Sequence, residues 1–132
     1  AIMHEIVHHI YRYYIEDDAD NRVIWFDEGL AMNFSLQNDK YKDEDTFKEF
    51  LNNRVFSITN IPCINNLKHG SDFVNKNYNG YDLAYLAVKY LIENNSDEDF
   101  YLIMKNKKVI RDIGENILDI AINYYYNIYN KK

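Results

Sequence analysis

Two histidines and a glutamate near the start of the chain have the types and the spacing of a zinc site. They form the motif His4-Glu5-Ile6-Val7-His8. On a helix, residues i and i+4 lie on one face, about 6 Å apart along the axis, so two imidazoles can share one Zn²⁺. The intervening Glu5 lies near the same metal and can act as general base on a metal-bound water. The alternative is an ordinary surface helix with two unrelated histidines.

A catalytic zinc needs a third protein ligand and one open position. The best candidate is Glu28, in the stretch Trp25-Phe26-Asp27-Glu28-Gly29-Leu30-Ala31. Residues 9 to 27 leave enough chain for a turn and for a second helix that returns beside the first. Gly29 costs about 1 kcal/mol in a helix relative to Ala, and a Gly and an Ala near Glu28 let two helices approach closely. The alternative is that Glu28 is a solvated acid on an amphipathic helix.

Together the two motifs resemble the gluzincin zinc metallopeptidases, and most closely the bacterial "peptidase MA-like" families. The resemblance implies that His4, His8 and Glu28 bind zinc and that Glu5 is the catalytic base. It extends to Ile61–Leu67 and to residues 81–91, which are similar to later segments of those families, so it covers most of the chain. Only the metal motif is highly specific.

A gluzincin also needs a donor that stabilises the oxyanion opposite the metal. In the resemblance, Tyr81 falls where aminopeptidase-like members carry theirs, so we expect Tyr81 to have this role. Tyr78 and His69 remain as alternatives, and the chain has 13 Tyr, most of which must serve packing. Asp27 and Asn33 are candidate hydrogen-bond acceptors for the ligand histidines. His9 points about 100° away from His8 around a helix and should not bind the same metal.

Composition predicts one domain with a real core. The chain has 132 residues, of which 47% are hydrophobic and 16% aromatic. A net charge of −6 argues against a nucleic-acid partner. We expect no membrane span and find no signal peptide in this chain, so the compartment is left open. Cys63 is the only cysteine, which excludes an internal disulfide. Abundant Asn, Lys, Ile and Tyr, whose codons are AT-rich, favour a bacterial source.

The pattern predicts an all-α bundle resembling the C-terminal helical part of a gluzincin catalytic domain, with no sheet of three or more strands. The expected helices are residues 1–16, 23–36, 43–54, a short helix within 61–67, 80–93, 100–105 and 112–129. Asp20 or Asn21 should cap the second helix, Asp43 or Asp45 the third, and Ser96 the helix after residue 96. Residues 55–59 are expected to be extended, and residues 68–79 to form a polar loop. Gluzincins carry a β-sheet before the metal helix, so we expect the chain to be a fragment of a longer protein with an upstream β-rich segment.

The leading functional prediction is a zinc-dependent metallopeptidase that hydrolyses peptide or protein substrates, with Glu5 as general base. The isolated chain is expected to be poorly active if it lacks its sheet. The alternative is a catalytically silent helical binding or assembly module that retains the zinc site. A purely structural zinc is disfavoured, because three ligands beside a glutamate describe an open site.

Overall fold

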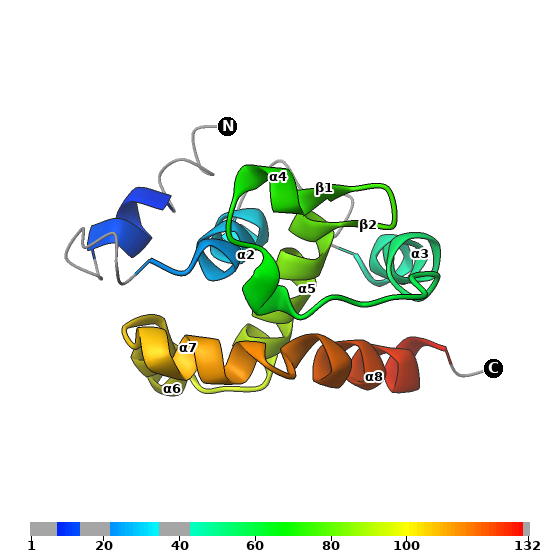
Figure 1. Ribbon diagram of the computed structural model, residues 1–132. Helices are drawn as coiled ribbons and strands as arrows, with labels where there is room; N and C mark the ends of the chain where they lie inside the picture. The colour runs from blue at the N-terminus through cyan, green and yellow to red at the C-terminus, as the bar shows by residue number, and fades with distance from the viewer. Residues whose placement is uncertain (1–7, 14–21, 35–42, 131–132) are drawn as a thin grey trace.

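The computed structural model describes residues 8–13, 22–34 and 43–130, and this part of the chain is mostly helical (Figure 1). Residues 8–13 are helical, and the labelled elements follow in chain order. They are α2 (Ile24–Phe34), α3 (Glu44–Arg54), η3 (Ile64–Asn66), α4 (Gly70–Phe73), β1 (Val74–Asn75), β2 (Tyr78–Asn79), α5 (Gly80–Glu93), α6 (Asp97–Met104), α7 (Lys107–Gly114) and α8 (Ile117–Tyr129). The only sheet in these ranges is the antiparallel pair β1–β2, so the predicted all-α class is confirmed. No helix among the described residues is long and apolar enough to span a membrane.

Four helices begin at a side chain that accepts hydrogen bonds from the first turn. Asp43 accepts from Thr46 N at 2.8 Å, and Ser96 accepts from Asp99 N at 3.1 Å. Asn79 caps α5, and Asn106 caps α7. These bonds satisfy backbone donors that no helical carbonyl can reach, which fixes where each helix starts. The predicted caps Asp43 and Ser96 are confirmed, whereas Asp20 and Asn21 lie outside the described residues.

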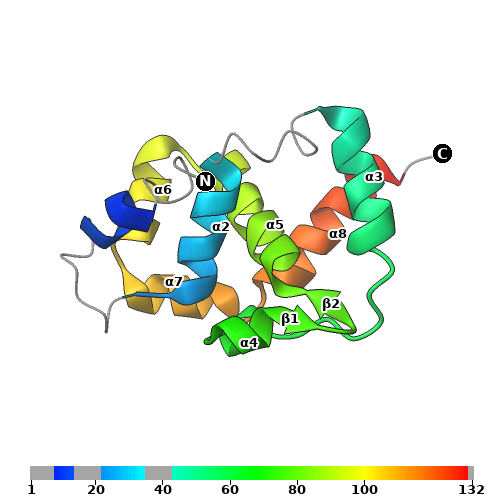
Figure 2. The same ribbon diagram turned by 90° about the horizontal axis from the view of Figure 1, so that it is seen from above.

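Helix α5 is the centre of the fold and packs between α2 and α8 (Figure 2). Its apolar residues Leu83, Ala84, Ala87, Val88 and Leu91 are all buried, as the sequence predicts. Aromatic side chains fill the space toward α3 and α8; the ring of Phe47 meets the rings of Tyr85 and Tyr125 edge-on. The packing of α2 against α5 therefore fixes the position of any site on α2.

Gly29 explains how closely α2 approaches α5. A Cβ atom at this position would lie 2.4 Å from the backbone oxygen of Ala84 and 2.4 Å from Cγ2 of Val88. No side chain fits in that space, so glycine is required despite its low helix propensity. The close approach predicted at Gly29 is present, but its partner is α5 and not the helix that carries His8.

Two predictions about the middle of the chain were wrong. Residues 55–59 form a turn and bends instead of an extended piece, because the amides of Val55 and Phe56 both donate to Leu51 O and close the end of α3. Residues 68–79 contain α4 and the β1–β2 hairpin instead of a loop. In the hairpin turn, Asn77 N donates to the side chain of Asn75, a local bond that helix and strand periodicity do not reveal.

The predicted helix 112–129 covers only the end of α7 and all of α8, and residues 107–111 of α7 were not predicted to be helical. Helix α7 ends at Gly114, where an added Cβ would lie 2.2 Å from Oδ1 of Asn65. On α8, Ile120 and Ile128 are 47% and 45% exposed. The buried face of α8 consists of Ile117, Leu118, Ala121, Ile122 and Tyr125.

Candidate metal centre

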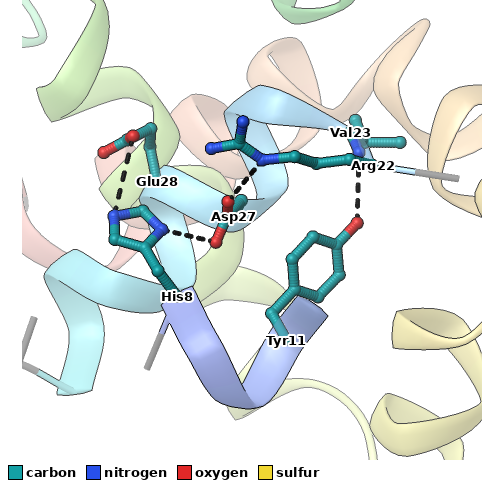
Figure 3. Close-up of polar contacts among 6 residues, drawn as sticks. All are labelled: His8, Tyr11, Arg22, Val23, Asp27 and Glu28. Carbon is teal, nitrogen blue, oxygen red and sulfur yellow. Dashed lines mark hydrogen bonds and ion pairs between the residues drawn. The ribbon is translucent and has the colours of Figure 1, made fainter. Parts of the chain in front are cut away.

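The helical segment 8–13 is held against the start of α2 by Tyr11. Its side chain is fully buried, and its hydroxyl accepts a hydrogen bond from Val23 N at 3.1 Å (Figure 3). Burial raises the pKa of the Tyr11 hydroxyl, and the nearby charge of Asp27 adds to that effect. The Tyr11 ring also packs against Phe26, with ring centroids 5.8 Å apart. These contacts place one face of the 8–13 helix beside the first turns of α2.

Where the 8–13 helix meets α2, His8 and Arg22 share the carboxylate of Asp27. His8 Nδ1 lies 2.6 Å from Oδ1 of Asp27, and Arg22 Nε donates to Oδ2 at 2.8 Å. Asp27 is fully buried, so both of its oxygens depend on such partners. Asp27 is thus the acceptor for His8 that the sequence suggested, and its bond to Arg22 fixes the direction in which the carboxylate points.

The bond to Asp27 determines which nitrogen of His8 remains for other chemistry. In a neutral imidazole that donates from Nδ1, the lone pair is on Nε2. In Figure 3 the Nε2 side of the ring faces Glu28, and Nε2 lies 3.7 Å from Oε1 of that residue. His8 is 8% exposed, and the Glu28 side chain is 18% exposed. His8 Nε2 and a carboxylate oxygen of Glu28 therefore face each other at a separation that favours a positive charge, either a proton on Nε2 or a metal ion between the two.

This pair fits a zinc ion in three respects. Tetrahedral coordination at the usual zinc distances separates two donors by about 3.4 Å, close to the observed value. Neutral imidazole and carboxylate are both common zinc ligands. A carboxylate on the far nitrogen of a ligand histidine is the usual arrangement behind such ligands, and Asp27 occupies that place. A protonated His8 between Asp27 and Glu28 would satisfy the same distances without metal.

The rest of the predicted zinc site is not placed. His4 and Glu5 lie outside the described residues. Within the described ranges, no group of three or more His, Cys, Asp or Glu side chains could hold a metal. The described part therefore contributes two of the three predicted ligands, His8 and Glu28. His9 is exposed while His8 is buried, as expected for neighbours on different sides of a helix.

The three candidates for oxyanion stabilisation lie in or beside α4, the hairpin and the start of α5. The Tyr81 ring packs on Phe73 with centroids 4.7 Å apart, and Tyr81 N donates to the side chain of Asn79. Tyr78 is partly buried on β2. His69 is exposed just before α4, where its amide donates to Asp72. None of these contacts joins a candidate to His8 or Glu28, so the role predicted for Tyr81 stays a prediction.

Asn33, the other candidate partner of a ligand histidine, serves the packing of two helices. It donates to Gly29 O at 2.7 Å and to Tyr85 O at 3.1 Å, so it ties α2 to α5 and is not a partner of His8. Arg22, which donates to Asp27, was not predicted as part of the site. A second buried carboxylate, Asp82, meets Arg54 Nε at 2.9 Å. Its position within an apolar stretch of α5 could have indicated such a pair.

Compared with known proteins, the chain matches no family model, no curated protein and no solved structure.

Proposed function

We propose that the chain is the helical part of a zinc-dependent metallopeptidase, with His4, His8 and Glu28 as metal ligands. The observation that carries the proposal is the pair of His8 Nε2 and Glu28 Oε1, 3.7 Å apart, with Asp27 on the other nitrogen of the imidazole. The H-E-x-x-H motif supplies the remaining residues, because this motif is spaced to put two histidines on one helix face around a shared metal.

The chain's own residues have separate tasks in this proposal. Asp27, held by Arg22, keeps a proton on Nδ1 of His8, so that Nε2 stays a ligand. Zn²⁺, when bound, supplies Lewis-acid polarisation of a peptide carbonyl and of water. Glu5 accepts the proton of the attacking water and passes it to the leaving amine. Tyr81 is proposed to donate a hydrogen bond to the oxyanion.

A second candidate function is a helical binding or assembly module. The bonds His8–Asp27–Arg22 and Tyr11–Val23 also fasten the 8–13 helix to α2, and a fold could keep them for that purpose alone. In that case the zinc site would be kept without its catalytic use, and no peptide hydrolysis would follow. The two functions differ in what Glu5 must do.

Two matched substitutions separate them. Glu5→Gln and Glu28→Gln each remove one carboxylate charge. Under the peptidase proposal, Glu5→Gln lowers peptide hydrolysis by about 10²-fold or more, the scale of general acid–base catalysis, while zinc stays bound. Glu28→Gln weakens zinc itself, so activity partly recovers with excess zinc. The assay uses a mixed fluorogenic peptide library, with the chain and with any longer form that carries an upstream segment.

Full activity in Glu5→Gln would reject its role as base. Loss of bound zinc in Glu5→Gln would show that Glu5 is itself needed to hold the metal, which contradicts its assignment as a base only. Zinc binding without hydrolysis by either form of the wild-type protein would favour the binding module.

A further inference from the structure

Arg22 also lines a cavity that the zinc proposal does not use. The cavity has a volume of about 430 Å³ and lies between the start of α2, the end of η3 and helix α7. Its lining includes Arg22, Trp25, Asn65, Lys68, Arg111 and Glu115. The volume lies within the range of small-molecule sites. Among the described lining residues, three are cationic and one is anionic, on a chain whose net charge is −6.

Asn65 gives the cavity a fixed wall. Its Oδ1 accepts from the indole nitrogen of Trp25 at 3.1 Å, and its Nδ2 donates to Arg111 O at 2.8 Å and to Glu115 Oε1 at 3.2 Å. Gly114 packs directly against this amide, where no Cβ fits. The side chain thus ties α2 and α7 together across the cavity, so the cationic residues stand on a preformed frame.

Within the described part of the chain, the acids nearby do not neutralise all of the cations. Arg22 Nε is bonded to Asp27, which leaves the other guanidinium nitrogens of Arg22 as donors. Glu115 is engaged by the amide of Asn65. Among the ion pairs between described residues, none includes Arg111. Guanidinium groups at such positions recognise oxyanions with two acceptor oxygens.

We propose that this cavity binds a small molecule through its oxyanion, a carboxylate or a phosphate, with Arg22 and Arg111 as the principal contacts and Lys68 as a further cation. The inference is independent of zinc and of peptidase activity. It also explains why basic residues from three separate segments meet at one cavity of an acidic protein.

The test is titration with inorganic phosphate and, separately, with N-acetyl-leucine, each by calorimetry at constant ionic strength. Trp25 is the only tryptophan, so its indole N–H gives a single ¹H–¹⁵N resonance that reports on the cavity. We expect saturable binding of one or both probes and a shift of that resonance with the same midpoint. Binding of phosphate alone or of the carboxylate alone assigns the source of the oxyanion.

Arg111→Gln and Lys108→Gln form the matched pair of variants. Both residues are exposed on α7 and carry one positive charge, but only Arg111 lines the cavity. We expect affinity to fall about tenfold or more in Arg111→Gln, the scale of one hydrogen bond to a charged group. In Lys108→Gln it should fall less than about threefold, because an exposed charge outside the site is screened. Equal losses in the two variants, or no saturable binding of either probe by the wild-type protein, would overturn the proposal.

Discussion

His8 Nδ1 and Asp27 Oδ1 lie 2.6 Å apart, and this contact selects the nitrogen through which His8 can act. It connects the first helical segment to α2 inside the protein, where the carboxylate is fully buried. Because Arg22 holds the other oxygen, the contact is part of a fixed chain of three side chains. The zinc proposal depends on this chain, since it presents Nε2 to Glu28.

The first prediction concerns the two hydrogen bonds of the Asp27 carboxylate, one to His8 and one to Arg22. Asp27→Asn replaces the charged acceptor behind His8 and should weaken zinc binding about 10- to 100-fold, as is usual for partners of ligand histidines. Arg22→Gln removes the other bond to the same carboxylate but leaves the contact with His8. It should change zinc affinity less than about threefold, because the tautomer of His8 is retained. Competition with a fluorescent zinc chelator measures both, and equal losses would show that the effect is structural.

Two glycines test how tightly α2 packs on α5. Gly29→Ala puts a methyl group 2.4 Å from Ala84 O and should destabilise the fold by about 1–3 kcal/mol, the cost of overpacking. Gly70→Ala is the control, because nothing lies within 4 Å of its added Cβ. We expect that variant to change stability by less than about 1 kcal/mol, with stabilisation favoured. Urea unfolding followed by circular dichroism gives the comparison, and a neutral Gly29→Ala would refute the close packing.

Alkaline pH should weaken the fold through Tyr125. Burial raises the pKa of this hydroxyl above its ordinary range, and its hydrogen bond to Glu93 raises it further. The unfolded tyrosine ionises near pH 10 while the folded one stays protonated, so its contribution is complete below that pH and is lost as pH rises above it. Tyr11 and Tyr129 also have raised pKa values, chiefly through desolvation.

Tyr125→Phe should therefore reduce the loss of stability above pH 10 without abolishing it. The exposed Tyr126 provides the control, and Tyr126→Phe should leave the wild-type pH dependence in place. Urea midpoints at pH 8 and pH 10.5 measure the difference. An unchanged alkaline loss in Tyr125→Phe would remove this residue from the explanation.

Local sequence signals predicted the helices that have clear caps and one apolar face. Helix α5 has the predicted bounds, because Asn79 caps it and its apolar residues recur at helical spacing. The division of α7 from α8 was missed, because it depends on Asn65 packing against Gly114 from a distant part of the chain. Tertiary contacts of this kind leave no periodic pattern in the sequence.

The candidate site was predicted in its residue types and only partly in its geometry. The motif spacing gave His8 and Glu28, and the structure brings these two together. The role of Arg22 depends on how the chain enters α2, and the oxyanion cavity depends on three segments that meet only in the fold. Neither could be read from spacing along the chain.

Zinc binding by the wild-type protein and by Glu28→Gln tests the central claim most directly. After reconstitution with Zn²⁺ and gel filtration, elemental analysis should find about one zinc per wild-type chain, because the proposed site has three protein ligands. Glu28→Gln replaces an anionic ligand with a neutral amide, so equilibrium dialysis should show zinc affinity lower by about tenfold or more. A wild-type chain that retains no zinc, or a Glu28→Gln variant that binds zinc as tightly as the wild type, would contradict the assignment of His8 and Glu28 as ligands of one metal ion.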